Sequence, residues 1–433
     1  RNHLLILPKA INLIKMKLKL LFSITILIFV FTTVNAQNLI RCASTEYQQQ
    51  QVNLNPGLQQ IFDQEDLNAA AFVANHQDGF TPQVICTIPV VFHVLYSSSA
   101  QNISNTRLTD QIAVLNKDFR KLNTDANLIP SVWQSIAADC EIQFCLAQRD
   151  PNGIATTGIE RIQTSTTSWG LNDAMKFASS GGANAWNRSK YLNIWVCNLS
   201  GGILGFAISP GGPASTDGVV LGYQYVGVVG ATAPFNKGRT ATHEIGHWLN
   251  MKHIWGDDGN ACTGSDFVND TPNQAGENYG CPSFPHTDNC TPAAPGVMTM
   301  NYMDYTDDAC MYMFTSGQKT RMWATLNGTR SSIKTSNGCT PSTVGISEEL
   351  MQNMFSINPT PTDGAFTLNF GSGSTANFDV SIYNILGEVI FQQHYSALNE
   401  NELHLNLDGN TAGIYLIEVR TTNGRTVKKI ILN

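Results

Sequence analysis

Three histidines and a glutamate stand close together in residues 242–253, at a spacing that suits metal chemistry. In a helix, positions i and i+4 share a face, so His243 and His247 can offer two imidazole nitrogens to one metal ion. Glu244 lies one step round the helix, where it can reach a metal-bound water rather than the metal itself. His253 can supply a third imidazole only if the helix ends after His247 and the chain turns back sharply.

That return of the chain falls at Asn250. The backbone there needs a positive φ, which Gly adopts freely and which Asn tolerates best among the other residues. Three nitrogen ligands with an open fourth position describe a catalytic zinc, because structural zinc sites close all four positions with protein groups. An ordinary buried helix is the competing interpretation, but three histidines and a glutamate would be costly to bury unpaired. We therefore expect one catalytic Zn²⁺, held by His243, His247 and His253.

The motif resembles that of the metzincin metallopeptidases, H-E-x-x-H-x-x-G-x-x-H, with Asn250 in place of the Gly. Downstream of the histidines, residues 301–305 (Asn-Tyr-Met-Asp-Tyr) look like the metzincin Met-turn. Such a turn would place Met303 beneath the zinc and let Tyr305 approach it. A lone Met and a lone Tyr are normally core residues, but their arrangement after the zinc motif favours the functional interpretation.

A finer resemblance is to the pappalysin family, particularly its bacterial cytophagalysin-like members, and it extends over residues 87–340. It implies an α/β metzincin-type catalytic domain with a twisted mixed sheet, an active-site helix and a Met-turn. It also implies a secreted zinc-dependent endopeptidase. The segments that carry the resemblance are 192–197, 243–257, 269–273 and 310–315.

In the reaction that we expect, Glu244 takes a proton from a zinc-activated water and passes it to the leaving amine, while Tyr305 hydrogen-bonds the oxyanion. From their position just after the Met-turn, we hypothesise that Asp307 and Asp308 favour a basic residue after the scissile bond. The alternative function is a surface adhesin or binding protein with a relict metal site. The intact Glu244 argues against it, because a relict site has no need of a general base.

The ten cysteines lack the C-x-x-C pairs of zinc ribbons and thioredoxin-like sites, which suits disulfides in an oxidising compartment. Family pairing implies the disulfides Cys262–Cys290 and Cys281–Cys310. A second zinc built from Cys262, Cys281, His286 and Cys290 is the competing interpretation, although these spacings match no common zinc finger.

Two further assignments are open at the level of sequence. Cys145 and Cys197 lie in expected strands and are a candidate disulfide, although sequence does not establish connectivity. The loop 257–271 is rich in carboxylate and amide oxygens, which Ca²⁺ prefers, and the family implies structural calcium in this region. A merely solvated acidic loop is the alternative. The candidate calcium ligands are Asp266, Asp270 and Thr271.

Residues 16–36 have the layout of a signal peptide, with a basic start, a short apolar run and a small residue before the cleavage point. The apolar run is shorter than the roughly 20 residues that a membrane-spanning helix needs. Residues 1–15 then correspond to translation upstream of a true initiator at Met16. Residues 37–86 are rich in Gln and Asn and precede the catalytic domain as an activation propeptide would.

Cys42 in this propeptide is a candidate latency switch. A thiolate is a strong zinc ligand, so Cys42 can fill the open position until the segment is cut away. The enzyme would then be made as a zymogen. A disulfide between Cys42 and another cysteine such as Cys86 is the alternative.

Hydrophobic patterning predicts the elements that position these residues. A helix capped by Asn105 or Thr106 carries apolar residues at the helical period as far as Leu122. Apolar, β-rich runs supply a sheet on which one face of that helix packs. Together they form the mixed α/β unit. The runs are 88–96, 142–146, 191–197 and 219–228.

After Cys339 the composition shifts to a linker, residues 341–354, and then to short strands. The runs 414–419 and 427–432 flank Asn423-Gly424, a strong hairpin signal. Residues 355–433 are therefore expected to form a small all-β sandwich. Phrases at 358–364, 384–388 and 413–416 resemble the C-terminal sorting domain of type IX secretion. A carbohydrate-binding or adhesive sandwich is the alternative.

The chain has 433 residues and a net charge of −7, with 42% hydrophobic and 14% charged residues. This apolar fraction excludes wholesale disorder, and the mild acidity argues against a nucleic-acid partner. No segment after the signal peptide is long and apolar enough to cross a membrane. We expect a protein exported through the periplasm to the cell surface or the medium. Its expected partners are protein or peptide substrates and the type IX secretion machinery.

Overall fold

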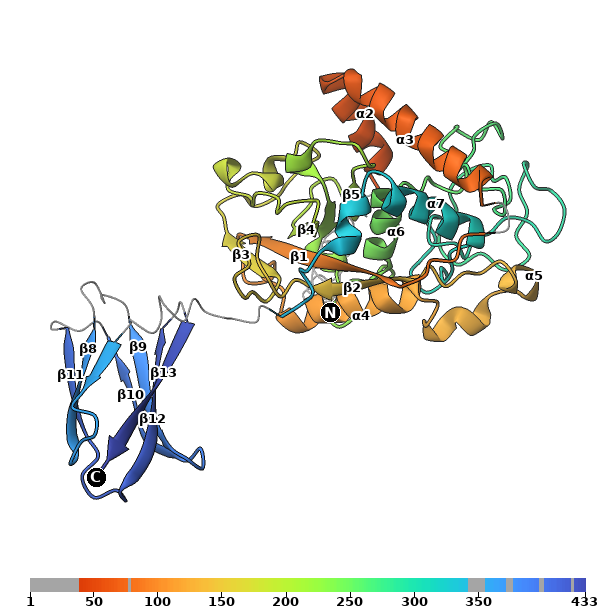
Figure 1. Cartoon of the computed structure of the whole chain (residues 1–433). Coiled ribbons are helices and arrows are strands. Elements are labelled where there is room, and N and C mark those ends of the chain that lie inside the picture. The colour runs from red at the N-terminus through yellow and green to blue at the C-terminus, as the bar shows by residue number, and fades with distance from the viewer. Residues whose placement is uncertain (1–38, 77–78, 342–354, 371–376, 397–400, 422–423) are drawn as a thin grey trace, which may run out of the picture. The chain divides into compact units, whose positions relative to one another are not determined.

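The computed structural model describes residues 39–76, 79–341, 355–370, 377–396, 401–421 and 424–433. The chain divides into two compact units (Figure 1): the larger ends at Cys339, and the smaller contains residues 340–433 together with the loop 148–157. The expected signal peptide, the residues before it and nearly all of the expected linker lie outside the described residues.

The larger unit is built on one sheet. Its strands are β1 (Cys86–Tyr96), β2 (Ile142–Leu146), β3 (Ile159–Gln163), β4 (Leu192–Cys197), β5 (Gly205–Ala207) and β6 (Val219–Gly222). Their order is β2-β1-β4-β6-β5, and β3 pairs with the second half of β1. At the edge, β5 runs antiparallel to β6, whereas the other pairs are parallel. The mixed sheet expected for the catalytic domain is thus confirmed.

The helices of this unit are α2 (Ser44–Leu54), α3 (Gly57–Ala74), α4 (Asn105–Phe119), α5 (Ser131–Gln134), α6 (Arg239–Trp248) and α7 (Ser316–Asn327). Short 3-10 turns lie at Thr124–Leu128, Ala174–Lys176, Ala178–Ser180, Ala214–Thr216, Tyr223–Tyr225 and Ser331–Thr335. In Figure 1, α3 lies along α7, and α2 contacts β5.

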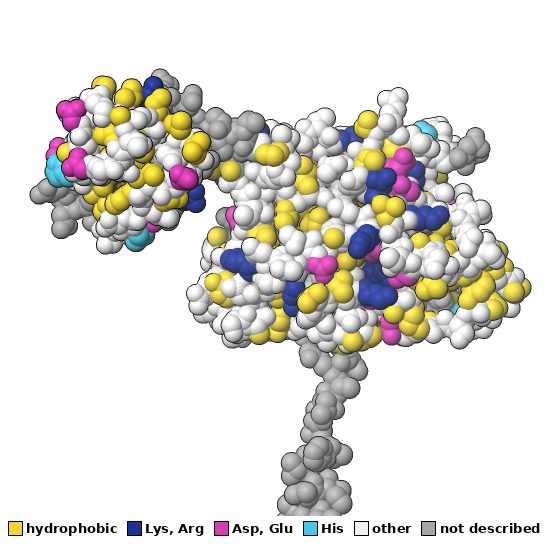
Figure 2. Space-filling view, turned by 90° about the horizontal axis from the view of Figure 1, so that it is seen from below, with side chains coloured by type: hydrophobic (Ala, Val, Ile, Leu, Met, Phe, Trp, Pro, Cys, Tyr) yellow, Lys and Arg dark blue, Asp and Glu magenta, His cyan; other side chains and the backbone are white. Residues whose placement is uncertain are grey.

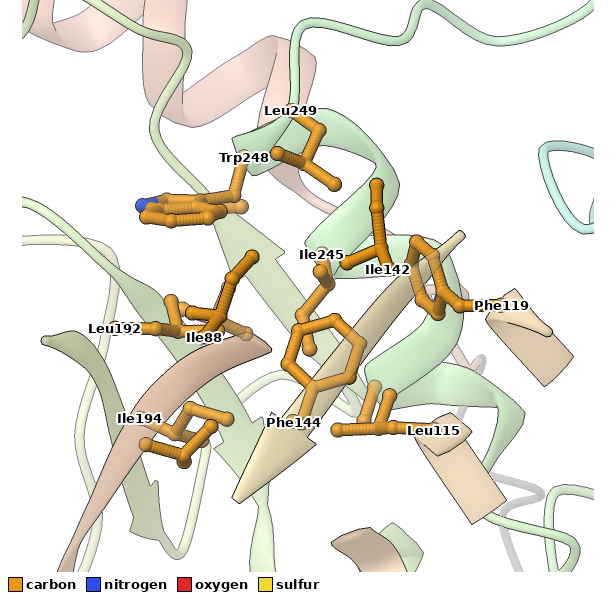
Figure 3. Close-up of a cluster of buried hydrophobic side chains, with 14 of the residues drawn as sticks. Ile88, Leu115, Phe119, Ile142, Phe144, Leu192, Ile194, Ile245, Trp248 and Leu249 are labelled. Carbon is orange, nitrogen blue, oxygen red and sulfur yellow. The ribbon is translucent and has the colours of Figure 1, made fainter. Parts of the chain in front are cut away.

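One buried cluster joins α4 and α6 to the sheet (Figure 3). Leu115 and Phe119 of α4 and Ile245 and Trp248 of α6 point into it. Because burial of large apolar side chains is the main favourable term in folding, this cluster fixes α6, and with it His243 and His247, on the sheet. The strand residues labelled in the cluster are Ile88, Ile142, Phe144, Leu192 and Ile194.

The boundaries of α4 differ slightly from the expectation. Ser104, rather than Asn105 or Thr106, caps the helix, and its Oγ accepts the backbone N–H of Arg107 at 3.3 Å. The side chain of Asn105 instead accepts a hydrogen bond from Arg161. Leu122 lies beyond the end of the helix and is 67% exposed, so the apolar period stops at Phe119.

Three disulfides link described residues: Cys145–Cys339, Cys262–Cys290 and Cys281–Cys310. The last two are the pairs that the family resemblance implies. They occupy the cysteines of the alternative second zinc site, which is therefore wrong.

The candidate pair Cys145–Cys197 is also wrong. Cys145 lies on β2 and Cys197 on β4, with β1 between them. Two strand spacings of about 4.8 Å exceed the roughly 7 Å over which a disulfide can join two Cα atoms. Cys197 is a free, buried thiol.

The smaller unit is an all-β sandwich, as expected. Its strands are β7 (Phe355–Asn358), β8 (Ala365–Phe370), β9 (Phe378–Asn384), β10 (Val389–Tyr395), β11 (Glu402–Asn406), β12 (Gly413–Thr421) and β13 (Gly424–Leu432). They form antiparallel sheets of order β10-β9-β12-β13 and β11-β8-β7 around an aromatic and aliphatic core. β12 and β13 pair as a hairpin, and the residue Asn423 of its expected turn lies outside the described residues.

On the face shown in Figure 2, basic and acidic side chains of the larger unit are interspersed among uncharged atoms. This mixture matches the low content of charged residues, 14%. Within the part of the chain that the structure describes, no helix has both the length and the apolar character that crossing a membrane requires.

Candidate metal centre and active site

α6 brings the first two histidines together. His243 and His247 lie one helical turn apart, and their Nε2 atoms are 3.1 Å from each other. His253 reaches the same point from beyond the helix, with its Nε2 3.0 Å from that of His247. All three side chains belong to buried residues, with 6% exposure or less. The structure therefore brings the three sequence-predicted ligands to one place.

In His243 and His247, the hydrogen bond that Nδ1 makes determines whether Nε2 is free to bind a metal ion. Nδ1 of His243 donates to the carbonyl of Tyr302 at 2.7 Å, and Nδ1 of His247 donates to that of Met251 at 2.9 Å. Because a carbonyl only accepts, Nδ1 carries the proton and Nε2 keeps a bare lone pair. Burial and the neighbouring rings hold the pKa of His243 and of His247 well below the usual value, so both imidazoles are neutral.

Lone pairs that face each other at this distance repel unless a cation lies between them. For zinc bound tetrahedrally with Zn–N distances of about 2.0–2.1 Å, ligand nitrogens lie about 3.3 Å apart. The observed separations of 3.0 and 3.1 Å are close to that value. The donor set therefore fits a zinc ion.

Asn250 makes the return turn. Its φ is 71°, in the left-handed region, as the sequence predicted, and α6 has ended two residues earlier. Arg321 of α7 fixes the turn by donating from Nε to the carbonyl of Asn250 at 2.8 Å. Beyond the turn, Asp257 orients His253 by binding its Nδ1 at 2.7 Å.

The expected Met-turn packs directly against α6. A Cβ on Gly246 would come within 2.5 Å of the Sδ of Met303, so the missing side chain at Gly246 lets the methionine lie under the histidines. The carbonyl of Tyr302, in the same turn, orients His243. The hydroxyl of Tyr305 lies 3.1 Å from Nε2 of His253. Both predicted residues of the turn thus lie beside the candidate metal centre.

Glu244 is completely buried next to the histidines. Its Oε2 accepts hydrogen bonds from Ser44 Oγ at 2.8 Å and from the Cys42 thiol at 3.4 Å. Its Oε1 has no hydrogen-bond partner among the described residues. Burial raises the pKa of this carboxyl to about 8. A carboxyl with an unsatisfied oxygen at this position is suited to accept a proton from a reacting group.

Residues 40–43 cross the site beside the edge strand β5. Ile40 forms a parallel bridge with Ile203, and the N–H of Ala43 donates to the carbonyl of Gly205 at 3.0 Å. Because β5 is the edge of the sheet, its backbone groups are open to another chain.

This segment carries Cys42 to the histidines. Its Sγ and the ligand nitrogens of the three histidines all lie within 4.8 Å of one another. Burial, followed by the charge of Glu244, raises the pKa of the Cys42 thiol well above its usual value. The alternative disulfide between Cys42 and Cys86 is not formed, because both thiols are free.

Arg41, the residue before Cys42, is buried in a neighbouring pocket. Its Nη2 lies 3.0 Å from Oδ1 of Asp308, and both residues are at most 2% exposed. Asp308 also accepts the backbone N–H groups of Lys237 and Arg239, at the start of α6. Asp308 therefore holds a guanidinium next to the candidate metal centre.

The carboxylates among the candidate calcium ligands accept hydrogen bonds from protein groups. Asp270 accepts from Thr315 Oγ1 and from the N–H of Gly317, at the start of α7. Asp266 accepts from Thr271 Oγ1 at 2.7 Å, and burial raises the pKa of Asp266 to about 7. Among the described residues, the clustered ligand atoms are those of the histidines and Cys42. The calcium site stays a prediction.

Sequence reasoning missed three of the residues that support the site. Asp257 stands four residues after His253, a local spacing that could have indicated their hydrogen bond. Arg321 lies 71 residues from Asn250, and Ser44 lies 200 residues from Glu244, so no local pattern connects these pairs.

Two family profiles match the chain. The peptidase family described as pregnancy-associated plasma protein-A matches residues 179–327, and the secretion system C-terminal sorting domain matches residues 356–433. An extracellular metalloprotease of Verticillium alfalfae is 35% identical over 265 residues, which are 57% of this chain and 78% of that protein. Extracellular metalloprotease 1 of Coccidioides posadasii is 33% identical over 252 residues, covering 54% of this chain and 75% of its own length.

Solved structures of metallopeptidases are also similar to this chain. Mature mirolysin of Tannerella forsythia, in complex with a cleaved peptide, is 52% identical, with a TM-score of 0.57, and the match covers 59% of this chain and 97% of that one. A promirolysin mutant of the same organism is 47% identical, with a TM-score of 0.62, and the match covers 68% of this chain and 96% of that one.

Site, fold and relatives together define a secreted or cell-surface metalloendopeptidase that carries a type IX sorting domain. The chain belongs to the pappalysin family of metallopeptidases. Membership in this family implies a catalytic zinc, and the non-enzymatic adhesin considered from the sequence is excluded.

The turn at Asn250 gives a first prediction. Asn250→Val should weaken zinc binding roughly tenfold, because a β-branched residue in the left-handed region costs about 1–2 kcal/mol. Asn250→Gly is the matched control and should retain zinc, since glycine adopts this φ freely. Competition with a chelator, followed by metal analysis, measures both affinities. Equal zinc affinity of the Val and Gly variants would show that the turn does not constrain the site.

Proposed function

We propose that the chain is the zymogen of a zinc endopeptidase in which His243, His247 and His253 hold the metal. The convergence of their Nε2 atoms is the observation that carries this proposal. When bound, zinc supplies Lewis-acid chemistry, which acidifies the attacking water and polarises the scissile carbonyl. The remaining steps fall to side chains of this chain.

Glu244 is the general base in this proposal. Its carboxylate takes the proton of the attacking water and delivers it to the leaving amine. Its burial and its unpaired Oε1 support this role, because the carboxylate is then reserved for the reacting atoms. The hydroxyl of Tyr305, beside His253, donates a hydrogen bond to the oxyanion that develops on the carbonyl.

Glu244→Gln in the activated enzyme should lower kcat by roughly 10³-fold, because the amide cannot accept the proton. Zinc content should stay at one per chain, since Glu244 is not a ligand in the proposal. Hydrolysis of a denatured protein, with and without a zinc chelator, measures the activity. Glu277→Gln, an exposed site with the same change of charge, is the control. Turnover of Glu244→Gln within a few fold of the parent enzyme would remove the assignment.

Residues 37–85 act as the propeptide in this proposal, one residue fewer than the sequence predicted because β1 begins at Cys86, and Cys42 keeps the enzyme latent. Supporting observations are the position of its Sγ at the histidines and the hydrogen bond from Ser44 to Glu244. Cys86 is the first residue of β1 and pairs with Ile142, so we place the activating cut in the exposed residues just before it. Residues 355–433 then direct export through the type IX machinery.

Cys42→Ala in the full-length zymogen should raise peptidase activity at least tenfold, because the ligand position at the histidines is no longer blocked by sulfur. The assay is cleavage of a quenched peptide before any processing, with chain integrity checked by mass spectrometry. Cys86→Ala, which removes another buried free thiol, is the control. A Cys42→Ala zymogen as inactive as its parent would end the switch hypothesis.

For the substrate, we propose a basic residue directly after the scissile bond, recognised by Asp308. The buried pair of Arg41 and Asp308 supports this, because it seats a guanidinium in a pocket next to the candidate metal centre. Bidentate or charge-assisted contacts to carboxylate are a preferred mode of arginine recognition.

Asp308→Asn should therefore lower the ratio of kcat/KM for peptides with Arg after the scissile bond to that for peptides with Leu there. The expected decrease is roughly tenfold or more, because the buried guanidinium loses its charge partner. The amide oxygen can still accept the N–H groups at the start of α6, so the ratio of the two substrates, rather than activity alone, is the readout. Asp307→Asn is the neighbouring control. An unchanged Arg-to-Leu ratio in Asp308→Asn would contradict the assignment.

A further inference from the structure

Tyr47 of α2 fills a hole in the larger unit and is completely buried. Its ring centroid lies 4.7 Å from that of Phe206 on β5, and the ammonium of Lys176 lies 4.5 Å from the ring centroid. Lys176 is also 5.5 Å from the ring of Trp195. The hole is thus walled by aromatic side chains and contains a buried cation.

The polar side chains at the bottom of the hole form hydrogen bonds with a hydroxyl group. The Tyr47 hydroxyl donates to Oδ1 of Asp173 at 2.6 Å and accepts from Nζ of Lys176 at 2.9 Å. Lys176 also pairs with Asp173 at 2.8 Å and donates to the carbonyl of Thr216 at 3.0 Å. Asp173 receives a second hydrogen bond from Gln51 of α2. The phenol of Tyr47 therefore completes the hydrogen-bond network of Asp173 and Lys176 by donating one hydrogen bond and accepting another.

The walls and the bottom of this hole belong to the part of the chain that remains after the propeptide leaves, whereas Tyr47 and Gln51 belong to α2. Departure of α2 removes one acceptor from Lys176 and two donors from Asp173. The result is an aromatic-walled hole with an unpaired ammonium donor and unpaired carboxylate lone pairs. Buried polar groups without partners are costly, so this hole favours a ligand that restores both contacts.

The hole lies at the edge strand β5, which also borders Glu244. Ser44, one helical turn before Tyr47, contacts both Glu244 and the N–H of Ala207. Phe206 follows Gly205, which lies close to the side chain of Glu244. Because successive strand residues face opposite sides of a sheet, the hole at Phe206 lies across the edge strand β5 from Glu244. On the other side of Cys42, Arg41 occupies the Asp308 pocket. Along the chain, the residues that fill the two sites thus stand on either side of Cys42, which lies at the histidines.

We propose that the hole vacated by Tyr47 is a substrate subsite for a tyrosine side chain, on the opposite side of the scissile bond from the Asp308 pocket. This inference rests on the proposed function and deepens it by naming a second specificity element. A site that hydrogen-bonds a hydroxyl discriminates strongly against an otherwise equal ligand without one, because its own polar groups are then left unpaired. Tyr should therefore be preferred over Phe, and not only over small residues.

The test uses the activated enzyme and peptides with Arg fixed after the scissile bond. Each position before that bond is occupied in turn by Tyr, Phe, Leu or Ala, and kcat/KM is measured. We expect one position at which Tyr exceeds Phe about tenfold. In Lys176→Met this ratio should fall to near one, because the thioether side chain fills space without donating. Lys190→Met, an exposed site, is the matched control and should keep the parent ratio.

The wild-type ranking alone decides the proposal should Lys176→Met fail to fold. Equal rates for Tyr and Phe at every position before the scissile bond would overturn the subsite while leaving the peptidase intact. The same peptides are also titrated into the inactive Glu244→Gln enzyme, so that binding is measured without turnover. Tyr binding no tighter than Phe binding there would overturn the subsite. Tighter Tyr binding there, together with no cleavage of any peptide by the activated enzyme that retains Glu244, would instead locate the failure in the proposed catalytic roles.

Discussion

The geometry of the site depends on one reversal of the chain, the left-handed turn at Asn250. A helix by itself presents two imidazoles on one face, and a third can join them only if the chain stops and returns. The turn is held from two sides. Trp248 and Leu249 are buried in the core of the sheet, and Arg321 of α7 binds the carbonyl of Asn250. Sheet, helix and α7 together therefore set the position of His253.

Buried charges complement both ends of the same helix. Asp308 accepts two N–H groups at its start, where the helix dipole is positive. At its end, Arg330 donates to the carbonyl of Trp248 at 2.9 Å and pairs with Asp217, which also accepts from the indole N–H of Trp248. Burying these ions is expensive, and their hydrogen bonds compensate that cost only in one geometry. We infer that they fix the orientation of α6 more than they add to stability.

The zinc motif could be predicted because its information is local: i, i+4 spacing, a residue tolerant of positive φ, and a turn carrying Met303. Helix α2 of the proposed propeptide could not, since its buried face consists of Ser44, Tyr47 and Gln51, which leave no hydrophobic period. β5 was missed because three residues are too few for a strand pattern. The disulfide Cys145–Cys339 closes a separation of 194 residues, which no local signal reveals.

The proposed latency arises because a few consecutive residues, 42–44, cover the reacting groups. Sγ of Cys42 lies at the histidines, and its carbonyl accepts from the hydroxyl of Tyr305 at 3.3 Å. Two residues on, Ser44 binds Glu244. The candidate metal position, the proposed oxyanion donor and the proposed general base are thus each occupied by residues 42–44, and a backbone hydrogen bond from Ala43 to Gly205 holds this segment beside β5. Because these contacts share one short segment, removing α2 and α3, which follow it in the chain, releases them together.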